Sequence, residues 1–132
     1  MTLSGYSGTQ EYLLKMLMKE TIRLLQQDFE SSSMETEQFK HFALTFRREL
    51  VKTLKANFGI KDFTFSRGHF YCSGFFKTED DKVYYFSMSD VRHFPKAGLL
   101  IRTAKDFKDY TGGSNNYLEF SENMFENYKL PA

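Results

Sequence analysis

The hydrophobic and polar residues between positions 63 and 90 follow a pattern that predicts antiparallel sheet. Nine Phe and Tyr residues lie from Phe63 to Phe86, and aromatic residues favour strands. The pattern is broken at Arg67-Gly68 and again at the acidic run of residues 79–81, and turn residues of this kind separate the strands of a β-meander. A further apolar alternation follows after residue 98. We therefore predict four strands, at residues 62–66, 69–77, 82–89 and 99–104.

A first segment with helical spacing precedes this sheet. Its apolar residues recur from Leu13 to Phe29, which predicts a helix that starts at Thr9 and ends near Phe29. The polar run of residues 30–33 then provides the loop of a helical hairpin. Residues 1–8 are small and polar, and we expect them to be flexible.

The second helix has the clearer signal. Thr36 is a suitable N-terminal cap, and Gly59 fits a left-handed C-terminal cap. Arg47 and Arg48 lie off the apolar stripe and form either a solvated face or a face that contacts phosphate. The stripe itself consists of Phe39, Phe42, Ala43, Phe46, Leu50, Leu54 and Phe58.

The sequence after the sheet is less regular. Residues 111–116 form a glycine- and asparagine-rich loop, and residues 117–120 are either a short strand or the first turn of a helix. We predict a short C-terminal helix from Ser121 to Tyr128 that buries Met124 and Phe125. The expected fold is a single α+β domain over residues 1–132, with two N-terminal helices, a four-stranded antiparallel meander and the C-terminal helix in two layers.

Strand alternation assigns the two faces of this sheet. A slip of one residue would exchange the faces, and a further helix or the C-terminal segment could cover the outer one. The inward positions are Phe70, Cys72, Phe76, Tyr84, Phe86, Met88, Leu99 and Ile101. The outward positions are His69, Tyr71, Ser73, Tyr85, Ser87 and Arg102.

Length, net charge and cysteine content limit the classes of protein to which this chain can belong. The 132 residues suit one domain with its own core. A net charge of +1 excludes a general acidic DNA mimic and a histone-like polycation. The single cysteine, Cys72, suits the core of a protein in a reducing cytoplasm. The absence of a signal peptide and of an apolar run of roughly 20 residues predicts a soluble cytoplasmic protein that makes no contact with a membrane.

The sequence contains no specific catalytic or cofactor motif. The three histidines and one cysteine lack the spacing of zinc ligands, so we expect no metal, no cofactor and no enzymatic activity. A nuclease site remains an alternative and would use Arg67, His69, Asp90, Arg92, His93 and Tyr110. The loop Thr111-Gly112-Gly113 is read as a plain turn, although its N–H groups could cradle a phosphate.

A binding surface is the remaining candidate for function. The outward face and its flanks combine tyrosines with basic residues, a pairing common in protein interfaces and in platforms for single-stranded nucleic acid. The candidate binding residues are Arg67, His69, Tyr71, Tyr85, Arg92, Arg102, Lys105 and Lys108.

The stretches FSRGHFYCSGFF, VYYFSMSDVRHF and LLIRTAKDFKDYTGGSNN resemble, in size and style, the small phage and mobile-element proteins of low-GC Gram-positive bacteria. Among these, the chain resembles the anti-CRISPR proteins. The resemblance implies a stoichiometric inhibitor of a bacterial effector protein or nucleoprotein, such as an RNA-guided nuclease, in the host cytoplasm. The alternative is a nucleic-acid-binding accessory protein that stacks bases on Tyr71 and Tyr85 and holds phosphates with arginine and lysine.

Overall fold

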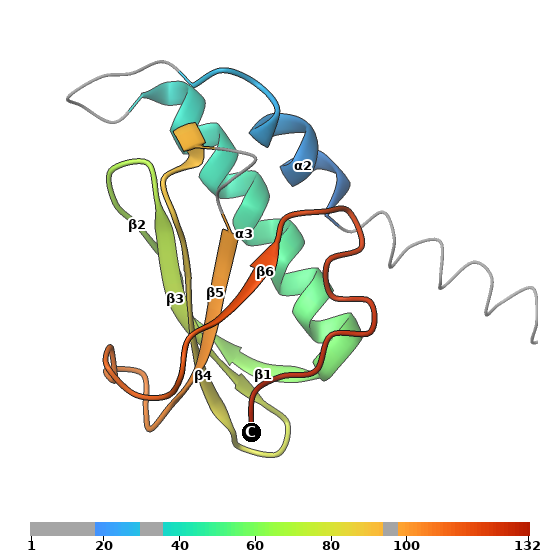
Figure 1. The fold of residues 1–132 in the computed structure, drawn as a ribbon, viewed down its shortest axis with the longest axis vertical. Helices are drawn as coiled ribbons and strands as arrows, with labels where there is room; N and C mark the ends of the chain where they lie inside the picture. Colours follow the sequence, from blue (N-terminus) through green and yellow to red (C-terminus); the bar gives the residue numbers. More distant parts are fainter. Residues whose placement is uncertain (1–17, 30–35, 94–97) are drawn as a thin grey trace, which may run out of the picture.

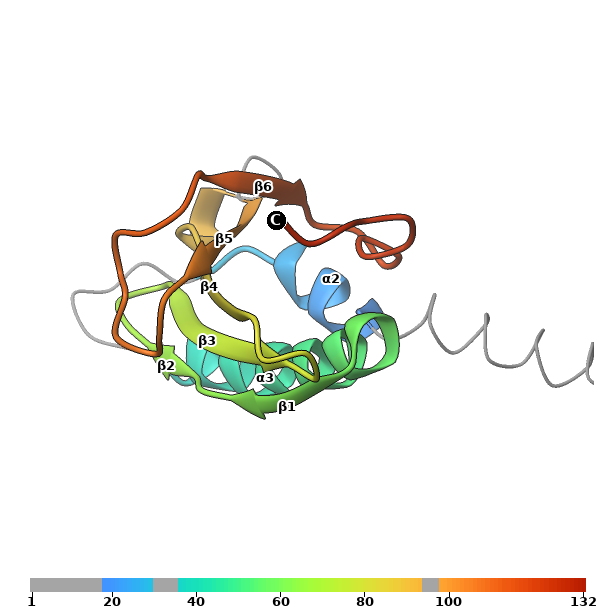
Figure 2. The same cartoon turned by 90° about the horizontal axis from the view of Figure 1, so that it is seen from below.

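Two helices pack against one face of a curved antiparallel sheet in the computed structural model, which describes residues 18–29, 36–93 and 98–132 (Figures 1 and 2). The sheet has six strands in the order β1-β3-β4-β5-β6, and β2 pairs with β3 beside β1. The chain is therefore α+β, as predicted. The described elements are α2 (Lys19–Leu25), α3 (Glu37–Phe58), β1 (Ile60–Phe63), β2 (Ser66–Arg67), β3 (Cys72–Thr78), β4 (Val83–Met88), the 3-10 turn η1 (Val91–His93), β5 (Gly98–Ala104) and β6 (Asn116–Glu119).

The bounds of α3 agree with the prediction. The Thr36 hydroxyl accepts a hydrogen bond from the Phe39 N–H at 3.1 Å, which caps the first turn. At the other end Gly59 has φ +66° and donates its N–H to the Lys55 carbonyl at 3.1 Å. A positive φ is strained for residues with a Cβ, so the chain ends this helix at a glycine.

The first predicted helix differs from the structure at its C-terminal end. α2 stops at Leu25, because the Gln27 N–H bonds back to Leu24, only three residues earlier. Phe29 lies beyond the helix, yet its ring packs edge-on against Phe42 at 5.7 Å. Phe29 therefore fits the apolar pattern because its side chain packs in the core, although the residue belongs to the linker after α2. Three predictions lie outside the described residues: the helix start at Thr9, the flexibility of residues 1–8 and the loop at residues 30–33.

The predicted first strand is divided in two at Thr64. The Thr64 N–H donates to the Phe75 carbonyl at 2.8 Å, and the Thr64 hydroxyl accepts from the Phe75 N–H at 3.0 Å. A side chain thereby takes a ladder position that normally belongs to the backbone. Gly74 permits this close approach, since a Cβ there would lie 2.1 Å from the Thr64 carbonyl oxygen.

The second predicted strand also starts later than expected. Residues 68–71 form the turn between β2 and β3, closed by a 2.8 Å hydrogen bond from the Gly68 N–H to the Tyr71 carbonyl. Phe70 has φ +61°, which interrupts the alternation, and its side chain is nevertheless buried against Phe39. The inward positions named above are all buried, and the pairings confirm the predicted register from Cys72 to Ile101.

The predicted C-terminal helix is wrong. Before it, residues 116–119 form β6, which pairs with β5 as the sixth strand, so the short-strand alternative for residues 117–120 is confirmed. Beyond it, Met124, Glu126 and Tyr128 each donate to a carbonyl three residues earlier, and Asn127 has φ +63°. The result is a series of turns, because no helical i to i−4 ladder is formed.

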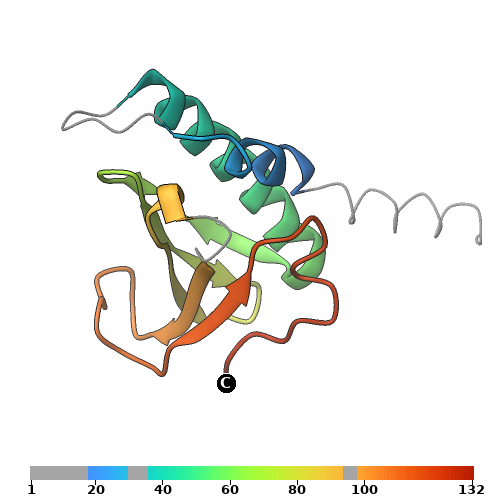
Figure 3. The same ribbon diagram turned by 45° about the horizontal axis from the view of Figure 1, so that its top comes forward.

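These turns still bury the expected apolar side chains. Met124 and Phe125 are buried, and the Phe58 ring at the end of α3 meets Phe125 and Tyr128 edge-on at 5.8 and 6.2 Å. The C-terminal segment therefore packs beside α3, and it leaves the outward face of the sheet to the loop between β5 and β6 (Figures 2 and 3). No helix in the described part of the chain is long and apolar enough to cross a membrane.

Candidate binding face

Three tyrosines stand exposed on the face of the sheet that points away from the helices. Tyr71, Tyr110 and Tyr117 expose 45, 60 and 68% of their surface. Among the described residues, the other large apolar side chain with comparable exposure is Leu44 on α3. Exposed aromatic side chains gathered on one surface are typical of binding sites. We call the surface formed by Tyr71, Tyr110, Tyr117 and the small side chains between them the tyrosine face.

Strand register places a row of mostly short side chains across the tyrosine face. Ser66, Ser73, Ser87, Leu100 and Tyr117 stand opposite one another on consecutive strands from β2 to β6. The hydroxyls of Ser66 and Ser73 lie 3.3 Å apart. Serine side chains are short, so this row leaves the Tyr117 ring at its end accessible, 68% exposed.

A second row on the same side is covered. Phe75 stands opposite Tyr85, and Tyr85 stands opposite Arg102. The loop between β5 and β6 folds over this row, with the Phe107 ring stacked 5.6 Å from Phe75 and the Tyr110 ring 5.2 Å from it. Phe75 is consequently only 3% exposed. The outward side therefore has a small aromatic cluster of its own beneath the loop, and Tyr110 forms its exposed top.

Arg102 holds this loop in place. Its guanidinium carbon lies 4.6 Å from the centre of the Tyr85 ring. The guanidinium donates to the carbonyl of Tyr110 and to the side-chain oxygen of Asn115. A guanidinium offers several donors in a fixed plane, so one side chain can tie a strand to two points of the loop. Arg102 and Tyr85 are thus half-buried components of the face.

Asp109 organises the same loop from within. Its carboxylate accepts hydrogen bonds from the N–H groups of Lys105 and Gly112, both at 2.9 Å, and of Thr111 at 3.2 Å. These bonds hold the pKa of Asp109 below its usual range, because they stabilise the charged carboxylate. The N–H groups of Thr111 and Gly112 are therefore directed at a carboxylate of the protein itself, which explains the plain-turn role of this loop.

The turn between β2 and β3 forms the other border of the face. The Tyr71 ring lies directly over Gly68, where a Cβ would come within 2.2 Å of the ring. Arg92 lies 4.2 Å from the centre of the Phe70 ring and donates through Nε to Asp90 at 2.9 Å. Asp90 raises the pKa of the Arg92 guanidinium and offsets its charge.

The predicted binding residues thus fall into two groups. Arg67, His69, Tyr71 and Arg92 lie on or beside the turn between β2 and β3, whereas Tyr85, Arg102, Lys105 and Lys108 lie under or within the loop of residues 105–115. The sequence prediction did not include Tyr110 or Tyr117 in the binding surface, and it named Tyr110 only for the alternative nuclease site. The alternation of Tyr117 with Leu118 was a usable signal for Tyr117, but the contact of Tyr110 with Phe75 depends on loop geometry.

The residues of the alternative nuclease site also lie in two separate places. Asp90 and Arg92 bond to each other beside Phe70, whereas Tyr110 packs on Phe75 and Tyr85. The side chain of His93 lies outside the described residues. Within the described ranges, no three His, Cys, Asp or Glu side chains are grouped as a metal site would require. Comparison of the chain with protein-family models, with curated proteins and with solved structures finds no match.

Proposed function

We propose that this chain is a non-enzymatic protein-binding module that acts through the tyrosine face. The observation that supports this proposal is the exposure of Tyr71, Tyr110 and Tyr117 on one side of the sheet, beside a row of serines. Tyrosine supplies a large, rigid contact area with a polar tip, and it is enriched among the residues that dominate interface energy.

The charges around the face favour a protein partner over a nucleic acid. Arg92 is paired with Asp90, and Arg102 is bonded to the loop that it supports. Asp106 and Asp109 lie in the same loop as Lys105 and Lys108. Nucleic-acid affinity depends on cations that replace the counterions of phosphates. A face whose cations have carboxylates close by is better suited to a mixed protein surface.

The resemblance to anti-CRISPR proteins supplies the first target to test. On that basis we propose that the partner is a bacterial RNA-guided nuclease, bound stoichiometrically in the cytoplasm of the host. An inhibitor of this kind must bind tightly but need not catalyse a reaction. Binding energy concentrated in three tyrosines suits that requirement.

A cleavage assay with purified RNA-guided nucleases tests this proposal. The chain is titrated against a fixed concentration of nuclease, guide and target DNA. Inhibition that is complete near one chain per nuclease, and that varies little with salt, is the expected result. If no nuclease is inhibited and the chain instead binds single-stranded DNA or RNA with a steep salt dependence, the proposal is wrong and the nucleic-acid alternative holds.

A further inference from the structure

A groove of about 290 Å³ runs between α3 and β2, on the side of β2 away from β3. One wall comes from the solvent side of the long helix, and the other comes from the end of the divided edge strand. The lining residues are Ala43, Leu44, Arg47, Phe65, Ser66 and Arg67. It is distinct from the tyrosine face, with which it shares only Ser66 at the border.

The groove combines apolar and cationic side chains. Leu44 is 60% exposed although it is a large aliphatic residue in the middle of a helix. Phe65 is half-buried, and the Arg47 guanidinium carbon lies 5.9 Å from its ring centre. The described residues that line the groove include two arginines and no acidic side chain. A ligand that complements it therefore carries both apolar groups and negative charge.

The edge strand adds main-chain groups to this groove. Thr64 and Gly68 donate their N–H groups to Phe75 and Tyr71, and Ser66 stands opposite Ser73. In an antiparallel pair the residues between such positions point their N–H and C=O groups to the opposite side. The main chain of Phe65 consequently points away from β3, toward the open edge. Open edges of this kind pair with an added strand.

We propose that the groove binds an extended acidic peptide segment of a partner protein. The segment adds as a strand beside β2, with its backbone bonded to Phe65. One carboxylate pairs with the Arg47 guanidinium, and an aliphatic side chain two residues away packs on Leu44 and Phe65. Residues two apart in a strand share one face, and a carboxylate meets a guanidinium through charge-assisted bonds, so acidic and aliphatic residues that take turns at every second position fit both parts of the groove.

A peptide of about nine residues, long enough to span β2 and both of its flanks, tests this proposal. The probe carries glutamate and leucine in turn at every second position, with threonine between them, and it bears a fluorescent label. Its binding to the full chain is followed by anisotropy. We expect saturable binding that weakens at least tenfold in Arg47→Glu and in Leu44→Asp. Arg48→Glu is the matched control, because Arg48 is an exposed arginine adjacent to Arg47 in α3 and does not line the groove. Circular dichroism verifies that each variant is folded.

Two further peptides distinguish binding as an added strand from general electrostatic attraction. A peptide with lysine in place of glutamate should not bind, and a peptide with N-methylated backbone at alternate positions should bind at least tenfold more weakly. Backbone NMR shifts on binding should concentrate at residues 43–47 and 64–67. The proposal is overturned if there is no saturable binding up to about 1 mM, the weak limit for specific peptide recognition. It is equally overturned if Arg47→Glu and Arg48→Glu lose affinity to the same extent.

Discussion

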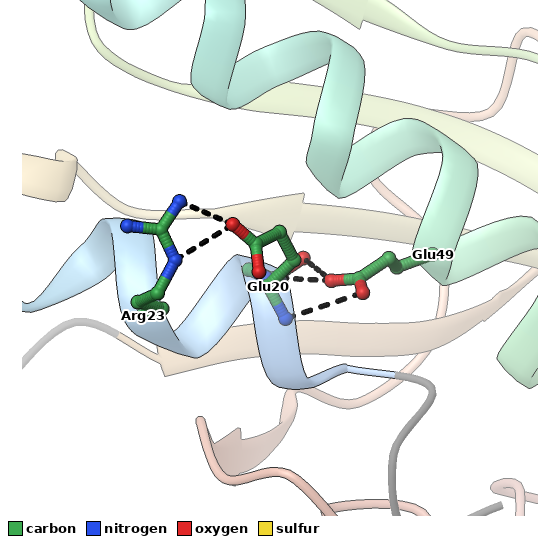
Figure 4. Close-up of polar contacts among 4 residues, drawn as sticks. Glu20, Arg23 and Glu49 are labelled. Atoms are coloured by element: carbon green, nitrogen blue, oxygen red, sulfur yellow. Dashed lines mark hydrogen bonds and ion pairs between the residues drawn. The ribbon is translucent and has the colours of Figure 1, made fainter. Parts of the chain in front are cut away.

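The carboxylate of Glu49 accepts hydrogen bonds from both the backbone N–H and the hydroxyl of Thr21, each at 2.6 Å. The same carboxylate accepts from the N–H of the neighbouring Glu20 at 3.2 Å (Figure 4). Met18, the residue before α2, makes no side-chain cap of its own. A carboxylate from α3 therefore caps the first turn of α2, where the unpaired N–H groups and the positive end of the helix dipole favour a negative charge.

Loss of this contact should detach α2 from α3. Glu49→Ala leaves the N–H groups of Glu20 and Thr21 without a buried acceptor, so we expect a loss of about 2 kcal/mol in the free energy of unfolding. Glu49→Gln keeps one acceptor oxygen and should lose less. Urea denaturation measures both, with the exposed Lys52→Ala on α3 as the control. A change below about 0.5 kcal/mol in Glu49→Ala would show that the cap is unimportant.

The centre of the core should be far more sensitive. Phe46 is fully buried and its ring contacts Phe42, Phe65 and Phe120. Phe46→Ala leaves a cavity between α3 and the sheet, and we expect it to cost about 3 to 5 kcal/mol of unfolding free energy. Denaturation in urea again provides the measurement. A loss under about 1 kcal/mol would contradict the central position of this ring.

Sequence patterns captured the parts of this fold that are set by local periodicity. The stripe of α3 and the inward alternation from Cys72 to Ile101 were predictable, because each places apolar side chains on one side of a regular element. Thr64 could not be anticipated, since its hydroxyl replaces a backbone group only in the context of Phe75. The role of Glu49 likewise depends on a contact 28 residues away in the chain. On the outward side of the sheet, the position of Tyr85 followed from strand register, whereas the position of Tyr110 depends on the loop.

The loop over the second aromatic row should depend on Asp109. Asp109→Ala removes the acceptor for three backbone N–H groups, so amide hydrogen exchange at Thr111 and Gly112 should become faster. Glu122→Ala, an exposed acidic change in the C-terminal segment, is the control. Because the folded-state pKa of Asp109 lies below its usual value of 3.8, loop order should be complete above that pH and decline as the pH falls through the lowered pKa. Unchanged exchange in Asp109→Ala would count against this role.

At high pH the C-terminal segment should loosen. Burial raises the pKa of Tyr128 to about 12 from its ordinary value of 10.0, because the folded protein disfavours the phenolate. Its contribution to stability is complete below pH 10.0 and is lost as the pH rises toward about 12. The thermal midpoint of the wild type should therefore fall across that interval, and Tyr128→Phe should fall less steeply. Equal slopes for the two proteins would show that another group controls the alkaline transition.

The tyrosine face can be separated from the fold by a paired substitution. Tyr71 and Tyr117 are exposed and lie outside the core, so the Tyr71→Ala and Tyr117→Ala double variant should leave the thermal midpoint nearly unchanged. The Tyr71→Phe and Tyr117→Phe double variant keeps both rings and should retain most of the binding. Comparison of the two double variants shows whether binding depends on the area of the aromatic rings or is lost with any substitution at these positions.

The most direct test of the binding role is quantitative affinity capture from a bacterial lysate, with the wild-type chain, the alanine double variant and the phenylalanine double variant as baits. Each capture is repeated after digestion of nucleic acid, and bound protein and RNA are both measured by mass spectrometry. We expect a protein partner whose capture survives the digestion and is retained by the phenylalanine variant. Its capture should fall at least about thirtyfold with the alanine variant, as expected for the loss of about 2 kcal/mol at an interface hot spot. Equal capture by the wild type and the alanine variant, or binding that disappears with the nucleic acid, would contradict it.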